Sequence, residues 1–204
     1  SMTKAGHIYL IDDDESMRVS LSRMLSELGY LVDDYASAKV FMEKSVPVSP
    51  AVILLDMQMP DMTGLDLQEQ LLKYGRKTPI VFVSGQSHPH QIVQGLKKGA
   101  LDFLFKPFNL EDLLKAVAEA VEFDRRQLKR ISKEVEIKKD YATLTPREKE
   151  VCFWLVKGLL NKDIAVKLGS ADFIRQNNND IFTGDTATIP TTSIPSNAVP
   201  FWVK

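Results

Sequence analysis

The chain has a single cysteine, no long hydrophobic run and almost no net charge, and each absence excludes a class of protein. Cys152 is alone among 204 residues, which excludes an internal disulfide framework and a cysteine-rich zinc site. Apolar runs such as 51–55 and 80–83 are far shorter than the about 20 residues that span a bilayer. The formal net charge of −1 gives no overall signature of nucleic-acid binding. We therefore expect a reduced, cytoplasmic protein without a membrane segment.

Short apolar runs alternate with helical patterns from His7 to about Ala120, which is typical of consecutive βαβ units. Two of the runs are almost entirely apolar, as expected for strands covered on both faces. The pattern predicts an α/β fold with a five-stranded parallel doubly wound sheet, flavodoxin-like in order. The expected strands are His7–Ile11, Leu31–Tyr35, Ala51–Leu55, Ile80–Ser84 and Asp102–Phe105.

A long helix and then a small helical domain are predicted after this sheet. Asn109 can cap a helix that continues through the charged stretch 123–139, which indicates a helical linker or, alternatively, a dimerising coil. Thr145, Pro146 and Glu148 form a capping box for a further helix, and Asn161 can cap a second short one that ends at Gly169. The expected boundaries are 1–122, 123–141, 142–170 and an atypical, flexible tail over 171–204.

Polar side chains stand at the carboxyl ends of the predicted strands, where parallel α/β sheets bind ligands. Asp12, Asp13 and Asp14 follow the first strand, and Asp56 follows the third. Crowded carboxylates oppose one another's ionisation unless a hard cation such as Mg²⁺, or Mn²⁺, lies among them. One carboxylate can then attack phosphorus and form an acyl phosphate.

Two further strand ends supply groups that suit phosphoryl oxygens. The fourth strand ends in Ser84-Gly85 and the fifth is followed by Lys106, so a hydroxyl, an open backbone N–H and an ammonium are available. Each signal alone is weak, because a strand-end Asp often only caps a helix. Together the four strand ends predict a phosphoacceptor site.

The runs IYLIDDDESMR, ILLDMQMPDMTGLDL, VFVSG and DFLFKPF resemble the receiver domain of two-component response regulators over about residues 5–125. The resemblance implies that a histidine kinase is the phosphodonor. It implies that Asp56 is the phosphoacceptor and that Ser84, Gly85 and Lys106 contact the phosphoryl group. The metal ligands that it implies are Asp12, Asp13, Asp56 and the backbone carbonyl of Gln58.

The same resemblance implies a switch. Ser84 would move towards the phosphoryl group and Phe103 would fill the space behind it, which reshapes a face that then forms a homodimer. A plain core aromatic is an equally good interpretation of Phe103. Asp14 has no role in the resemblance, and we expect it to cap the first helix.

The segment LTPREKEVCFWLVKGLLNKDIAVKLG resembles the start of the LuxR-type helix-turn-helix of the FixJ/NarL class. That class reads DNA with a following helix in the major groove. Here the sequence after Gly169 departs from the pattern, and Arg175 is the only basic residue between Ser170 and Val203. This departure counts against specific DNA binding by this chain.

Three functions remain open. The first is a phosphorylation-controlled regulator of transcription, which is not an enzyme beyond self-dephosphorylation. The second is a receiver that acts as a phosphate sink or protein-binding module without DNA binding. The third is a haloacid-dehalogenase-like phosphatase with Asp12 as nucleophile, which lacks a further acidic motif and leaves Asp56 without a task. His88 and His90 are expected at a helix start, and Cys152 in a core, rather than in metal or nucleophilic sites.

Overall fold

The computed structural model describes residues 5–167. The chain divides into two compact units, of which the first ends at Arg130 and the second begins at Ile131. The first unit contains a five-stranded parallel sheet in the order β2-β1-β3-β4-β5. Its strands are β1 (His7–Ile11), β2 (Leu31–Tyr35), β3 (Ala51–Asp56), β4 (Ile80–Ser84) and β5 (Asp102–Phe105). The predicted fold class and all five predicted strands are confirmed, with β3 one residue longer than expected.

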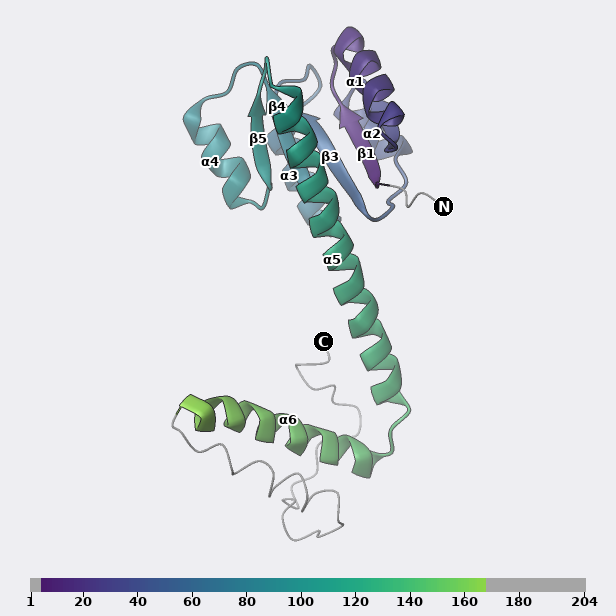
Figure 1. The fold of residues 1–204 in the computed structure, drawn as a ribbon, viewed down its shortest axis with the longest axis vertical. Coiled ribbons are helices and arrows are strands. Elements are labelled where there is room, and N and C mark those ends of the chain that lie inside the picture. Colours follow the sequence, from purple (N-terminus) through teal and green to yellow (C-terminus); the bar gives the residue numbers. More distant parts are fainter. Residues whose placement is uncertain (1–4, 168–204) are drawn as a thin grey trace. The chain divides into compact units, whose positions relative to one another are not determined.

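Helices cover both faces of this sheet (Figure 1). The helices are α1 (Glu15–Glu27), α2 (Ala38–Lys44), α3 (Gly64–Lys73), α4 (Pro89–Lys97) and α5 (Leu110–Ala142). One core cluster lies on the side of α2 and α3 and contains Phe41, Leu67 and Phe82. The other cluster lies on the side of α1 and α5 and contains Leu25 and Val117. Every residue of β3 and β4 is buried, which explains their continuous apolar runs.

Local capping sets the helix starts nearest the carboxyl ends of the strands. The carboxylate of Asp14 accepts the backbone N–H of Met17 at 3.1 Å, so the expected cap of α1 is confirmed. Thr63 and Asp66 form a reciprocal capping box at the start of α3. Asn109 accepts the N–H of Glu111 at 2.8 Å where α5 begins. These caps end three strand-to-helix loops at defined residues. Asp12, Asp13 and Lys106 lie on such loops, and Asp56 is the last residue of β3.

A buried carboxylate attaches helix α5 to the amino end of β3, the end of the strand away from the site. Asp124 is 6% exposed, and its Oδ2 accepts the Ser49 hydroxyl at 2.7 Å and the Ala51 N–H at 2.8 Å. Gln127 donates to the Lys77 carbonyl from the next turn of the helix. The first compact unit therefore includes the beginning of the charged stretch 123–139, which is helical as predicted.

In the described part of the second unit, residues 131–167, the end of α5 is followed by α6 (Pro146–Lys167). Thr145 and Glu148 form the expected capping box at its start. The predicted break between Gly158 and Asn161 is absent, because α6 continues through both residues. A lone glycine opposes a helix by only about 1 kcal/mol and no proline follows Pro146 in this helix, so local sequence does not force a turn.

Predictions for residues 168–204, including the stop at Gly169 and the tail from 171, lie outside the described residues. Within residues 5–167, no helix is both long enough and apolar enough to cross a membrane.

Candidate phosphoacceptor site

Three carboxylates meet at the carboxyl ends of β1 and β3. Ligand oxygens of Asp12, Asp13 and Asp56 all lie within 4.8 Å of one another. Asp12 and Asp56 are buried, at 3% and 7% exposure, whereas Asp13 is exposed. The parallel pairing of β1 with β3 brings these loops together from positions 43 and 44 residues apart in the chain. The sequence-predicted acidic group is therefore assembled as expected.

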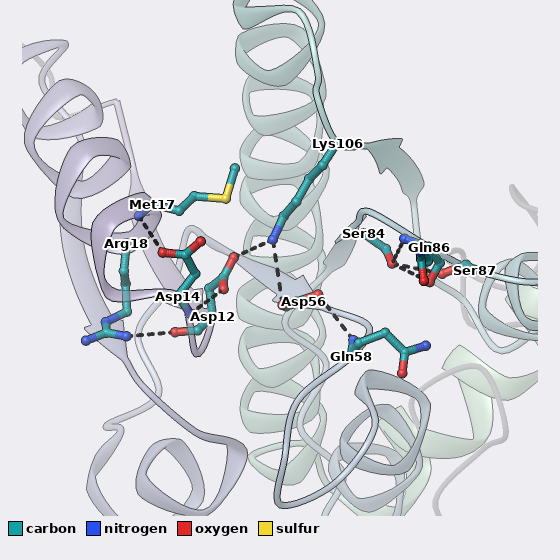
Figure 2. A network of polar contacts seen from close by, with 10 residues as sticks. All are labelled: Asp12, Asp14, Met17, Arg18, Asp56, Gln58, Ser84, Gln86, Ser87 and Lys106. Carbon is teal, nitrogen blue, oxygen red and sulfur yellow. Dashed lines mark hydrogen bonds and ion pairs between the residues drawn. The ribbon is translucent and has the colours of Figure 1, made fainter.

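Lys106, directly after β5, contacts two of the three carboxylates (Figure 2). Its Nζ lies 2.8 Å from Oδ2 of Asp12 and 3.6 Å from Oδ2 of Asp56. Burial lowers the pKa of Lys106, but the hydrogen bond to Asp12 and the charge of Asp56 outweigh it, so the pKa is raised. The ammonium is therefore charged at neutral pH and neutralises part of the acidic group.

Asp56 is a buried carboxylate next to two others, and both conditions oppose its ionisation. Burial, followed by the charges of Asp12 and Asp13, raises the pKa of Asp56 from 3.8 to about 6, despite the opposing Gln58 N–H and Lys106. Burial therefore opposes ionisation of Asp56, the carboxylate predicted to be the nucleophile.

We predict that the metal-free receiver unit loses stability as the pH rises. The folded pKa of Asp56 lies above the unfolded value, so the folded state favours the protonated side chain. The stability that this protonated side chain contributes is complete below about pH 4 and is lost as the pH rises past about 6. The loss amounts to about 1 to 3 kcal/mol. Urea unfolding of the chain and of Asp56→Asn in a chelator, at pH 4.5 and 7.5, measures it. The variant should become the more stable by that amount at pH 7.5; a pH-independent difference between the two contradicts the prediction.

The donor set fits a hard divalent cation. Three carboxylates within ligand reach of one point offer only oxygen atoms, which Mg²⁺ and Mn²⁺ prefer. A 2+ charge would also offset the repulsion that raises the pKa of Asp56. Gln58 lies on the adjoining loop and donates its backbone N–H to Oδ1 of Asp56 at 3.2 Å. Gln58 is exposed. The predicted role of its backbone carbonyl as a metal ligand stays a prediction.

The loop after Asp56 returns close to the site because Gly64 has no side chain. A Cβ at Gly64 would lie 2.8 Å from the carbonyl oxygen of Asp56, closer than the Cβ atom of a real residue approaches another heavy atom. The Gly64 N–H donates to the Met57 carbonyl at 2.9 Å. Glycine is therefore needed here for close approach of α3 to the end of β3, which explains its place in the motif.

Ser84 is fully buried, but its hydroxyl is directed away from the acidic group. It donates to the Gln86 carbonyl at 3.0 Å and accepts from the Ser87 hydroxyl at 2.9 Å (Figure 2). Within residues 5–167, no hydrogen bond joins Ser84 to Asp56. Gly85 is exposed, and a Cβ there would meet only Cβ of Lys106, at 4.0 Å. The predicted contact of Gly85 with a phosphoryl group stays a prediction.

Phe103 is partly buried and packs against the core cluster of α2 and α3. Its ring centroid lies 5.8 Å from that of Phe82 and 5.3 Å from that of Phe105. The two interpretations of this residue, a switch and a core aromatic, both fit these contacts.

Sequence reasoning missed Arg18. Its Nη1 donates to the Asp12 carbonyl at 2.9 Å and its Nε pairs with Asp34 at 3.0 Å, which fixes the loop that carries the acidic pair. The signal for it was the position of Arg18 one helical turn after Asp14. His88 caps α4 as a helix-start residue, and Cys152 is only partly buried in α6.

Two families match the chain. Residues 8–118 match the response regulator receiver domain, and residues 142–172 match the bacterial regulatory proteins of the luxR family. The response regulator protein TodT of Pseudomonas putida is 36% identical over 165 residues, which cover 81% of this chain and 73% of TodT. The transcriptional regulatory protein FixJ of Bradyrhizobium diazoefficiens is 34% identical over 168 residues, which cover 80% of each protein.

Solved structures agree with these matches. A low-resolution structure of the response regulator StyR is similar with a TM-score of 0.69 and 31% identity, covering 87% of this chain and 90% of that one. The crystal structure titled FixJ-N has a TM-score of 0.54 and 31% identity, covering 59% of this chain and 96% of that one.

Proposed function

Because the chain belongs to the response regulators, with a receiver domain followed by a luxR-family region, we propose that Asp56 is its phosphoacceptor. The observation that carries the proposal is the geometry around Asp56: a buried carboxylate within reach of two others and 3.6 Å from a lysine ammonium. In the proposed reaction a carboxylate oxygen of Asp56 attacks the phosphorus of a donor. The new O–P bond forms as the bond from phosphorus to the donor breaks and the electron pair leaves with the donor.

The other predicted residues hold the transferred group. Lys106 already lies between Asp12 and Asp56, so its ammonium is placed to pair with a phosphoryl oxygen on Asp56. Ser84 would exchange its bond to the Gln86 carbonyl for one to a phosphoryl oxygen. Gly85 is exposed and has no side chain, and we propose that its backbone N–H binds a phosphoryl oxygen. A charged ammonium and a hydroxyl donor stabilise the negative charge that accumulates on the oxygens.

Asp12, Asp13, Asp56 and the Gln58 carbonyl are the groups that we propose to hold Mg²⁺ or Mn²⁺. An ion held by these groups would supply positive charge against the phosphoryl oxygens. Without it, the two neighbouring carboxylates repel an incoming phosphoryl group as well as one another.

The consequence of phosphorylation is control of transcription, in line with the receiver and luxR matches. We propose a histidine kinase as donor and a homodimer as the phosphorylated state. The movement of Ser84, followed by Phe103, would reshape the face next to β5. We propose no catalytic turnover beyond self-dephosphorylation, and a cytoplasmic location. The proposed domain limits remain 1–122, 123–141, 142–170 and 171–204.

We predict that a phosphoryl mimic changes the DNA binding of this chain if the luxR-family region functions. A gel-shift titration with a promoter fragment, with and without beryllofluoride and Mg²⁺, measures this. Promoter-specific affinity should rise at least about tenfold with the mimic, because dimerisation doubles the protein's contacts with DNA. Absence of a sequence-specific shift in both states contradicts transcription control by this chain.

Two observations keep the phosphate-sink alternative in place. The family match to the luxR region ends at residue 172, and α6 runs unbroken where two helices are expected. The phosphatase alternative has less support, since residues 8–118 match the receiver domain and this alternative leaves the buried carboxylate of Asp56 without a role.

A further inference from the structure

Helix α4 contacts α3 and β5, and one of its contact points is buried. Gly95 is its only buried residue, while Val93 and Leu96 are 50% and 43% exposed. A Cβ at Gly95 would lie 2.9 Å from Cε2 of Phe82, closer than real side chains approach. The helix therefore approaches Phe82 of β4 closely through a glycine, and a group that binds this glycine helps to hold the helix in place.

Gln68 of α3 holds this point through a buried hydrogen bond. The residue is 2% exposed, and its Nε2 donates to the Gly95 carbonyl at 2.9 Å. The same carbonyl accepts the Ala100 N–H at 3.1 Å, so Gln68 binds the last turn of α4. A carbonyl can only accept, which fixes the orientation of the glutamine amide. An outer contact, Glu69 with Lys98 at 3.9 Å, is partly exposed and contributes little.

Packing alone does not explain a glutamine at this position. Its Oε1 is buried and has no hydrogen-bond partner within residues 5–167. An unsatisfied buried acceptor is unfavourable compared with an apolar side chain of similar volume. The inward neighbours on α3, Leu67 and Leu71, are apolar. What Gln68 supplies and a leucine would not is a directional bond between α3 and α4.

Both attachments of α4 lead back to Asp56. At its start, the loop of Gln86 and Ser87 is bonded to the Ser84 hydroxyl. At its end, Gln68 lies on the helix that begins at Gly64, next to the Asp56 carbonyl. The ring of Phe82 lies between the two helices, because it meets the Cβ positions of both Gly64 and Gly95, at 3.0 and 2.9 Å.

We propose that Gln68 is a positioning residue that holds α4 in the unphosphorylated arrangement and thereby limits how readily Asp56 is phosphorylated. The proposal rests on the proposed function of Asp56. In the proposal the bond from Gln68 to Gly95 is made in the unphosphorylated arrangement and broken in the other, so it shifts the population towards the first. Removing the bond frees the last turn of α4 and favours the arrangement that phosphorylation also favours.

The test compares Gln68→Leu with Gln70→Leu, a matched change on the same helix at a partly exposed residue. Hydrogen exchange of the α4 amides should be at least about fivefold faster in Gln68→Leu, with the amides of β1 and β3 unchanged. Labelling by acetyl phosphate should be at least about threefold faster at an unchanged Mg²⁺ requirement. General destabilisation would instead raise exchange in the strands and slow the labelling.

Equal α4 exchange in the two leucine variants overturns the proposal, and so does faster exchange with unchanged or slower labelling. Gln68→Met, which keeps the length of the side chain and removes its donor, replaces Gln68→Leu if the leucine variant does not fold. Exchange is measured without a phosphodonor. Failure of the parent chain to be labelled therefore counts against Asp56, whereas unchanged exchange counts against Gln68 alone.

Discussion

Asp56→Asn is expected to reduce incorporation of the phosphoryl group from acetyl phosphate by at least about 100-fold. An amide oxygen is a poor nucleophile, and a phosphorylated amide is not a stable product. The side chain keeps its volume, so the buried position of residue 56 is preserved. Intact-mass analysis of the chain after incubation with acetyl phosphate and Mg²⁺ measures the incorporation.

Asp14→Asn is the matched control. Asp14 stands in the same acidic run, but its carboxylate caps α1 and is absent from the group of three. This control should be labelled at nearly the parental rate. Reduction of the acyl phosphate followed by peptide mapping locates the label. A label on Asp12 would support the phosphatase alternative and contradict the assignment of Asp56.

Removal of divalent ions is expected to have an effect of similar size. Chelation should reduce labelling by at least about 100-fold, because three carboxylates and an incoming phosphoryl group then lie together with only one ammonium. Asp13→Asn should raise the Mg²⁺ concentration needed for half-maximal labelling by at least about tenfold, since the ion loses a charged ligand.

Binding of the ion is also measured without phosphorylation, through the rise of the unfolding midpoint with Mg²⁺ concentration. Asp33→Asn is the control, because it removes an exposed carboxylate that pairs with His7 outside the acidic group. Parental Mg²⁺ dependence in Asp13→Asn, by both labelling and unfolding, would exclude Asp13 as a ligand.

The sheet was predictable because its signals are local. β3 and β4 are buried on both faces and therefore read as continuous apolar runs, and each is bounded by polar residues at the end nearest the site. The helix caps at Asp14, Asn109 and Thr145 were also predictable, since capping depends on residues two or three positions apart.

The site was predictable in its membership and less so in its geometry. Strand order places Asp12, Asp56 and Lys106 together, and strand ends are visible in sequence. The direction of the Ser84 hydroxyl depends on the loop that follows it. The bond from Gln68 to Gly95 joins α3 to α4 between residues that are 27 positions apart in the chain. Such contacts depend on tertiary packing, for which a single sequence gives no signal.

The absence of a break in α6 has a related cause. The turn was predicted from Asn161 as a possible cap and from the resemblance to the LuxR-type helix-turn-helix. The segment 146–167 contains helix formers and one tolerated glycine, so local propensity favours the continuous helix.

The raised pKa of Asp56 has a consequence for evolution in the laboratory. In a chelator at neutral pH, the ionised side chain opposes folding, so a library of receiver variants selected only for thermal stability should lose Asp56 early. The same selection should retain Asp124, whose carboxylate accepts hydrogen bonds from Ser49 and Ala51. Selection for stability alone would thus remove Asp56, which the proposed phosphorylation requires. It would retain Asp124, which joins α5 to the start of β3.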